Sequence, residues 1–147
     1  MKILFMCVAN SARSQLAEGM AKILFGSKAQ ILSAGSQPAK VNPFAARALS
    51  EVGFDASSLY SKAVSDLPKD IVDSLDYVIT LCAEEVCPVI LSKAQKIHWP
   101  LPDPAGRPGT DEEQMAVFRS TRDEIRRRLE EFGRDKARNL NLFMDPS

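Results

Sequence analysis

The feature that most restricts the fold is a short apolar run that leads directly into a polar loop and a helix. Residues 2–6 (KILFM) are of the kind found in buried parallel strands. A loop of small and polar residues follows, and the segment 14–25 then has the periodicity of an amphipathic helix. Its apolar side chains fall at helical spacing: Leu16, Ala17, Met20, Ile23 and Leu24. A strand followed at once by a helix is typical of α/β folds.

The rest of the chain continues this alternation. Three further strands are expected, at 30–35, 75–82 and 96–104, the last of them stopped by three prolines. Two further helices are expected, at 42–53 and 110–133. Asn42 and Pro43 suit the cap and first position of a helix, and Gly53 suits the residue beyond its end. The pattern predicts a three-layer α/β sandwich with a parallel sheet, formed by one domain over residues 1–147.

Composition narrows the possible partners and compartment. The 147 residues are 45% hydrophobic, which suits one compact domain, and 19 basic residues balance 19 acidic ones. No strong field therefore attracts nucleic acid or an acidic membrane. The apolar run at the N-terminus is too short for a signal peptide, and no segment resembles a membrane span. We expect a cytoplasmic protein, in which three cysteines favour catalysis or metal binding over structural disulfides.

Chemically active residues follow three of the expected strands. Cys7 comes directly after the first strand, Cys82 closes the third, and Asp103 follows the fourth. In a parallel sheet, ligands bind at the carboxyl ends of the strands. The sequence therefore predicts one functional site at that edge, containing these three side chains.

The loop between Cys7 and Arg13 has the composition of an anion site. Its backbone N–H groups can form a nest at the start of the following helix, and Arg13 can add a bidentate clamp for a tetrahedral oxyanion. The positive electrostatic field of these N–H groups and of Arg13 favours the thiolate form of Cys7. Ser14 can donate a hydrogen bond to that thiolate. Asn10 tolerates the left-handed backbone that such loops need. The expected oxyanion-binding residues are Val8, Ala9, Asn10, Ser11, Ala12, Arg13 and Ser14. The alternative is a buried cysteine that merely ends a strand.

The segment 7–19 (CVANSARSQLAEG) resembles the signature loop of the low-molecular-weight protein tyrosine phosphatase superfamily. With SAG at 33–35, it is more similar to the thioredoxin-coupled arsenate reductases of that superfamily than to its phosphatases. The similarity extends over nearly the whole chain, as far as the acidic helix at 123–132. The resemblance implies a four-stranded sheet of order 2-1-3-4, with Cys7 as the nucleophile and Arg13 as the oxyanion ligand.

Asp103 lies in the segment LPDPAG, where the superfamily places its general acid. An oxygen expelled from arsenate or from a phosphate ester leaves faster when it is protonated, and a carboxylic acid above the loop can supply that proton. An isolated Asp-Pro pair is otherwise a turn signal. Catalysis by Asp103 therefore rests on the resemblance.

The resemblance also implies a relay of three thiols. Cys7 attacks arsenate, Cys82 attacks Cys7 and releases arsenite, and Cys87 attacks Cys82 to leave a disulfide that thioredoxin reduces. If the first and third strands are neighbours, their ends lie about 4.8 Å apart, so Cys7 and Cys82 can come within disulfide distance. The alternatives are two buried cysteines or a zinc site. Zinc is disfavoured because His98 is the only histidine and no fourth ligand is evident.

These observations predict an arsenate reductase without a tightly bound cofactor or metal. Its electrons would come from reduced thioredoxin or a thioredoxin-like donor, and phosphate or sulfate would compete with arsenate. One alternative is a low-molecular-weight protein tyrosine phosphatase or another phosphomonoesterase, which needs only Cys7, Arg13 and Asp103. A second, from another class, is a redox sensor or arsenite-binding module that does not turn over.

Overall fold

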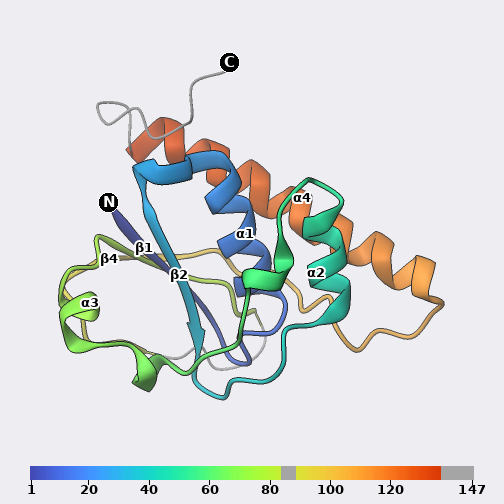
Figure 1. Ribbon diagram of the computed structural model, residues 1–147, viewed down its shortest axis with the longest axis horizontal. Coiled ribbons are helices and arrows are strands. Elements are labelled where there is room, and N and C mark those ends of the chain that lie inside the picture. Colours follow the sequence, from blue (N-terminus) through green and yellow to red (C-terminus); the bar gives the residue numbers. More distant parts are fainter. Residues whose placement is uncertain (84–88, 137–147) are drawn as a thin grey trace.

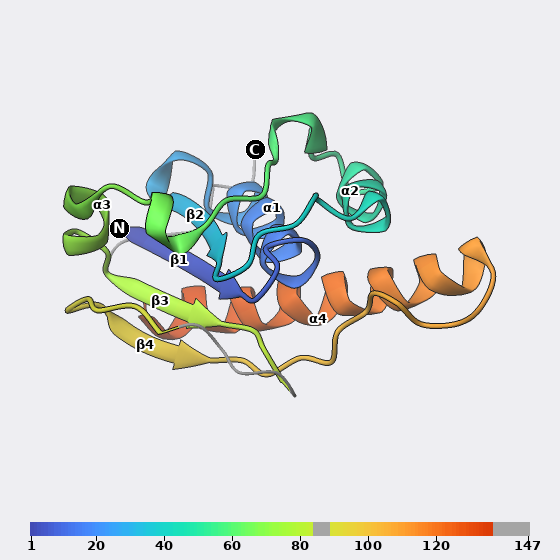
Figure 2. The same ribbon diagram turned by 90° about the horizontal axis from the view of Figure 1, so that it is seen from below.

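The computed structural model describes residues 1–83 and 89–136 and shows within them a four-stranded parallel sheet (Figure 1). Its strands are β1 (Lys2–Cys7), β2 (Gln30–Gly35), β3 (Tyr77–Thr80) and β4 (Gln95–His98). Their order is β2-β1-β3-β4, which confirms the order implied by the resemblance. All neighbouring strands are parallel, and their arrowheads point the same way in Figure 2. The carboxyl ends therefore share one edge.

Helices α1 (Arg13–Phe25) and α4 (Asp111–Lys136) cover one face of the sheet, and α2 (Pro43–Ser50) packs against both of them. Helix α1 is also in contact with α4. Ile3 and Phe5 of β1 belong to the same buried cluster as Leu16 of α1 and Phe118 of α4. The main core of the protein therefore lies between β1 and these helices, and it fixes where α1 begins relative to the end of β1.

The opposite face of the sheet has a thinner cover. Leu4 and Met6 of β1 cluster there with Val72 of the short helix α3 (Lys69–Asp73) and with Ile90 and Ala94 of the segment before β4. Figures 1 and 2 place α3 at the end of the molecule away from α2. The predicted three-layer α/β arrangement is confirmed, with one outer layer formed by a single short helix and loop segments.

The expected elements match the structure closely, and the differences have local causes. Asn42 caps α2 as predicted, because its side-chain oxygen accepts the N–H of Phe44 at 2.8 Å. Strand β3 is shorter than the predicted 75–82, because its ladder partner β4 covers only four residues. Helix α3 was not predicted, since five residues are too few to show helical periodicity.

An ion-pair cluster joins the end of α2 to α4. Arg119 Nη2 lies 2.7 Å from Glu51 Oε2, and Arg122 Nη1 lies 3.1 Å from Glu51 Oε1. Arg122 Nη1 also donates to the carbonyl of Ala48 at 2.8 Å. The hydrogen bond from Arg119 is the main reason why the pKa of Glu51 falls to about 2. This cluster fixes α2, and with it the segment that leads from the end of β2.

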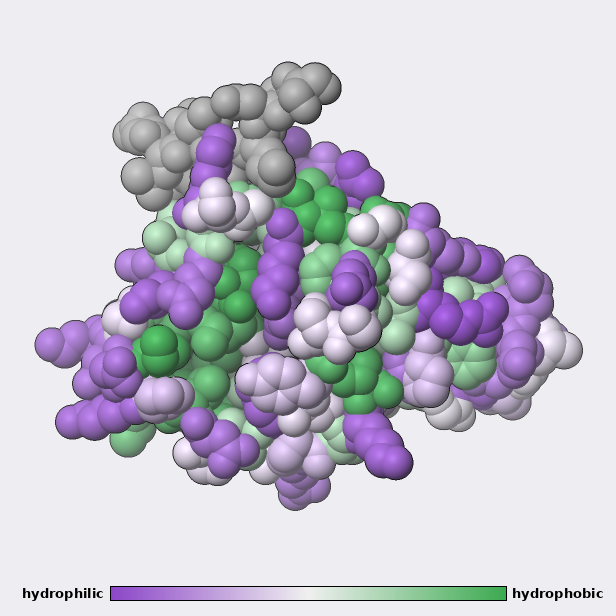
Figure 3. Space-filling model, viewed as in Figure 1, coloured by the Kyte–Doolittle hydropathy of each residue, from purple (hydrophilic) through white to green (hydrophobic). Residues whose placement is uncertain are grey.

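The surface is mixed in character. Figure 3 shows hydrophilic residues spread over one face, with smaller hydrophobic areas between them. Among the described residues, the large hydrophobic side chains that are exposed are Tyr60, Val89 and Leu91. Within residues 1–83 and 89–136, no helix combines the length and apolar character needed to cross a membrane.

Candidate active site

The predicted site residues that the structure describes lie at the carboxyl edge of the sheet. Cys7 is the last residue of β1, and Arg13 is the first of α1, so the connecting loop lies at that edge. The N–H of Leu81 donates to the carbonyl of Met6 at 2.9 Å, which places the chain after β3 beside the end of β1. Asp103, in the segment after β4, reaches the same place, with its Oδ2 3.9 Å from Arg13 Nη2.

The Cys7 thiol is free and almost completely buried, with 2% of its surface exposed. Its Sγ lies 2.9 Å from Ser14 Oγ. Ser14 Oγ also accepts a hydrogen bond from Asn10 Nδ2 at 2.8 Å. A serine hydroxyl has one hydrogen, and in this arrangement that hydrogen is free to point at the sulfur. Ser14 can therefore donate to Cys7 when the cysteine is a thiolate, which is the contact expected from the sequence.

Asn10 holds the loop in shape. Its φ of 47° confirms the expected left-handed backbone, and it is the one non-glycine residue with positive φ that the structure records among the described residues. Its side-chain Oδ1 accepts the N–H of Lys62 at 3.0 Å. Its carbonyl accepts from Gln15 Nε2 at 2.9 Å and from Ser61 Oγ at 2.7 Å. Each polar group of Asn10 in these contacts fixes the loop to another segment.

The loop carbonyls bond to the segment that follows β2. Backbone N–H groups within 37–42 donate to the carbonyls of Val8, Ala9 and Ser11 at 2.9 to 3.0 Å. Ser11 Oγ in turn donates to the carbonyl of Lys40 at 2.8 Å. The carbonyl side of the loop is thereby bonded to protein, as a nest needs if its N–H side is to face an anion.

Gly35, at the end of β2, allows the loop after Cys7 to lie directly against the strand. A Cβ atom at this position would lie 2.4 Å from the carbonyl oxygen of Val8, 2.8 Å from that of Cys7 and 2.9 Å from the nitrogen of Asn10. Such distances exclude any larger residue unless the backbone moves. Sequence reasoning noted Gly35 only as the end of a strand and as part of SAG, because the clash involves residues distant in the sequence.

Arg13 is fixed by backbone carbonyls. Its side chain is 5% exposed, and Nη1 donates to the carbonyl of Leu101 at 2.8 Å and to that of Leu81 at 3.4 Å. Asp103 is half exposed and also accepts the N–H of Ala105 at 3.0 Å, so it forms the turn that its Asp-Pro sequence suggests. The two interpretations of Asp103 are compatible, since its other oxygen faces Arg13.

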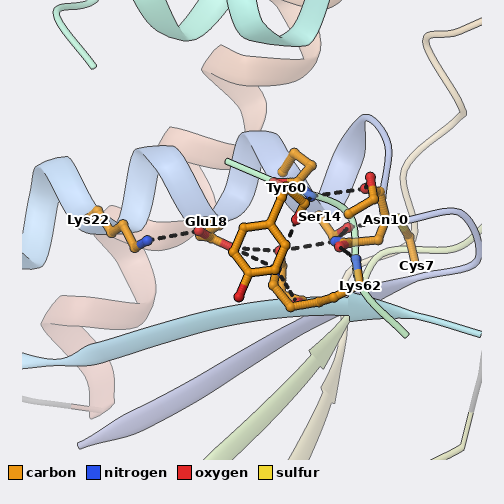
Figure 4. Close-up of polar contacts among 10 residues, drawn as sticks. Cys7, Asn10, Ser14, Glu18, Lys22, Tyr60 and Lys62 are labelled. Carbon is orange, nitrogen blue, oxygen red and sulfur yellow. Dashed lines mark hydrogen bonds and ion pairs between the residues drawn. The ribbon is translucent and has the colours of Figure 1, made fainter. Parts of the chain in front are cut away.

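A buried polar network behind the loop was missed in the sequence. Asn10 Nδ2 donates to Ser33 Oγ at 3.0 Å, and Ser33 Oγ donates to Glu18 Oε1 at 2.5 Å. Glu18 is paired with Lys22 at 2.8 Å and with Lys62 at 3.7 Å (Figure 4). The only signal was that Glu18 and Ser33 lie in the AEG and SAG parts of the family resemblance.

The other two cysteines differ in what the structure describes. Cys82 is buried and disulfide-bonded, whereas Cys7 is a free thiol, so these two are not bonded to each other. Cys87 lies outside the described residues. Within residues 1–83 and 89–136, no group of three or more histidine, cysteine or acidic side chains has the arrangement of a metal site. His98 is instead hydrogen-bonded through Nδ1 to Thr80 Oγ1 at 2.7 Å.

This chain is similar in sequence and in fold to proteins named arsenate reductases. An arsenate reductase of Halalkalibacterium halodurans is 42% identical over 132 residues, which cover 88% of this chain and 93% of the relative. A solved structure of an arsenate reductase in the phosphate binding state has 33% identity and a TM-score of 0.70, and the match covers 89% of this chain and 95% of the other. The thioredoxin-dependent arsenate reductase of Corynebacterium glutamicum has 28% identity and a TM-score of 0.60, over 88% of this chain and 61% of its own.

The family described as low molecular weight phosphotyrosine protein phosphatase matches residues 2–141, nearly the full length of the sequence. That match covers the loop from Cys7 to Arg13 and the segment that contains Asp103. The chain therefore belongs to the low molecular weight phosphotyrosine protein phosphatase family.

Proposed function

We propose that this protein reduces arsenate to arsenite, with Cys7 as the nucleophile and with electrons supplied by thioredoxin. The observation that carries the proposal is the contact of 2.9 Å between Cys7 Sγ and Ser14 Oγ, at the start of a loop that also holds Arg13. The proposal is supported by the similarity to proteins named arsenate reductases, one of which is named as thioredoxin-dependent.

The loop and Arg13 bind the oxyanion. The carbonyls of Val8, Ala9 and Ser11 are bonded to residues 37–42, which supports a nest in which the N–H groups of residues 8–14 bind the anion where α1 begins. Arg13 presents its guanidinium to the same space. A phosphate-bound state of one structural relative supports a tetrahedral anion as the ligand. Phosphate and sulfate are therefore competitors of arsenate.

In the first step the Cys7 thiolate attacks arsenic. A sulfur–arsenic bond forms, and one arsenic–oxygen bond breaks. The proton carried by the Asp103 carboxylic acid goes to the departing oxygen, which leaves as water. The distance of 3.9 Å between Asp103 and Arg13 supports this role, because it brings the acid to the guanidinium that would hold the anion. Ser14 stabilises the thiolate before attack.

In the second step the Cys82 thiolate, which is present once the disulfide of Cys82 has been reduced, attacks Cys7. A Cys7–Cys82 disulfide forms, the electron pair of the sulfur–arsenic bond passes to arsenic, and arsenite leaves. The burial of Cys82 just beyond the point where β3 pairs with the end of β1 supports this step. The Cys87 thiolate then attacks Cys82, freeing Cys7, and thioredoxin reduces the final disulfide. The role of Cys87 rests on the family resemblance.

A reaction that consumes reduced thiols fits a reducing compartment, so we place the protein in the cytoplasm. The chemistry needs no tightly bound cofactor, because both electrons come from thiols. We propose that residues 1–147 act as one catalytic domain.

A phosphatase is the second candidate, favoured by the family match and by the sufficiency of Cys7, Arg13 and Asp103 for phosphoester hydrolysis. Multiple-turnover assays of the purified chain with arsenate, thioredoxin, thioredoxin reductase and NADPH distinguish the two. Continuous NADPH oxidation that depends on both arsenate and thioredoxin is expected. Hydrolysis of a phenyl phosphate ester without arsenate turnover would establish the phosphatase instead. If the chain showed neither activity, a redox sensor or an arsenite-binding module would be the remaining function.

A further inference from the structure

Lys62 is a partly buried lysine that the proposed catalytic steps do not use. Its side chain is 15% exposed. Its Nζ donates to the carbonyl of Ser33 at 2.9 Å and to that of Tyr60 at 3.1 Å, and it lies 3.7 Å from Glu18 Oε1. The ammonium also sits 4.5 Å from the centre of the Tyr60 ring. Figure 4 shows this side chain beside the network that leads to the active-site loop.

When Cys7 is a thiolate, the hydrogen bonds from Lys62 to Cys7 can all run in one direction. The backbone N–H of Lys62 donates to Asn10 Oδ1 at 3.0 Å, which decides which end of the amide carries the two hydrogens. Those hydrogens go to Ser14 at 2.8 Å and Ser33 at 3.0 Å. Each serine then has its own hydrogen left to donate, Ser33 to Glu18 and Ser14 to Cys7.

We propose that Lys62 is a positioning residue that keeps Ser14 donating to the Cys7 thiolate. The main chain of Lys62 orients the Asn10 amide, and its ammonium keeps the Glu18 carboxylate as the acceptor for Ser33. This inference rests on the proposed function, in which the Cys7 thiolate is the nucleophile. Without the ammonium, the buried carboxylate loses a cationic partner, and a proton on Glu18 would make it compete with Asn10 as a donor to Ser33.

Other charged groups near Lys62 come from two elements. Glu18 and Lys22 lie on α1, and Asp66 lines the same cavity from the turn that follows Lys62. Burial lowers the pKa of Lys62, Glu18 opposes that shift, and Lys22 adds to it. Lys22 is the matched control, because it pairs with the other carboxylate oxygen of Glu18, Oε2, whereas Lys62 and Ser33 both face Oε1.

The test is the pH dependence of Cys7 alkylation by iodoacetamide in the reduced full-length chain, followed by mass spectrometry of the Cys7 peptide. Lys62→Met is expected to raise the pH midpoint by about one unit, so that alkylation at neutral pH slows about tenfold. Lys22→Met is expected to leave the midpoint within a few tenths of a unit. Equal shifts in both variants would mean that the loss of one positive charge, and not the contact of Lys62, changes the alkylation midpoint of Cys7. That result would overturn the proposal.

Ser33→Ala interrupts the chain while leaving the Lys62–Glu18 pair in place. It is expected to give the same shift as Lys62→Met, and the double variant no further shift, because both act through one route. An unchanged midpoint in Ser33→Ala overturns the proposal even if Lys62→Met fails to fold. Alkylation needs no arsenate, so the outcome is separate from any failure of the proposed reductase activity.

Discussion

Replacing Gly35 by alanine tests whether the position of the loop depends on the backbone of β2. The new Cβ would lie 2.4 Å from the Val8 carbonyl oxygen, whereas real Cβ contacts essentially never fall below 3.0 Å. The loop or the strand must therefore move by more than half an ångström. Overpacking against backbone costs about 2 to 3 kcal/mol of unfolding free energy, which lowers Tm by roughly 5 to 10 °C.

The same displacement misplaces the nucleophile. The clash also involves the carbonyl of Cys7 and the nitrogen of Asn10. A misplacement near 1 Å reduces catalytic rates about a hundredfold. We therefore expect kcat/KM for arsenate to fall by roughly one to two orders of magnitude, in addition to the loss of stability. The measurements are thermal unfolding and steady-state arsenate reduction coupled to NADPH, below the unfolding transition of the variant.

Gly19→Ala is the matched control. Its Cβ would lie 2.7 Å from two carbon atoms of the Leu49 side chain, which can rotate, and alanine favours the helix by about 1 kcal/mol. We expect a modest change in Tm and an unchanged kcat/KM. If Gly35→Ala kept both the Tm and the kcat/KM of the parent, the close approach of β2 would not determine the loop geometry.

Three further predictions follow from the site and the fold. Arg13→Lys is expected to lose the bidentate clamp and about 2 to 3 kcal/mol of transition-state stabilisation, measured as kcat/KM, together with weaker inhibition by phosphate; full activity would contradict it. Among the cysteine variants, Cys7→Ser should lose all activity, and Cys82→Ser should bind the oxyanion without releasing arsenite. Cys87→Ser should reduce about one arsenate per chain and then stop. Arsenite release in the presence of thioredoxin measures these outcomes. A Cys87→Ser enzyme that turns over like the parent would remove that cysteine from the relay. Because the pKa of Glu51 is lowered to about 2, its contribution to stability is present above the unfolded value near 4.5 and is lost as the pH falls toward 2, so unfolding curves of Glu51→Gln and the parent should converge in that range.

Local sequence signals predicted most of the fold because they act over a few residues. The cap at Asn42 and the left-handed backbone at Asn10 depend on the chemistry of one side chain, and both are present. The order of the strands came from the resemblance, because periodicity contains no information on which strands are neighbours. Helix α3 and the short extent of β3 depend on packing and pairing that no local pattern expresses.

The site was predictable where its residues are neighbours in the sequence, as with Cys7 and Ser14. The network through Ser33 and Lys62 was not, because Asn10 contacts them across 23 and 52 positions. The meeting of Asp103 with Arg13 was expected only as a general convergence at the edge of the sheet. Its distance depends on how the segment after β4 returns over the loop.

The carbonyl contacts of Arg13 have a consequence for the order in which the protein acquires reactivity. The cysteine and its serine partner lie within eight consecutive residues, so that contact is available as soon as the first strand and helix have formed. The guanidinium, by contrast, is held by the carbonyl of Leu101, near the C-terminal third of the chain. A chain synthesised only as far as α1 therefore lacks the carbonyl that anchors the arginine, and it also lacks residues 37–42, 61 and 62, which hold the loop. Oxyanions in the cell meet a complete binding site only after the last strand has docked.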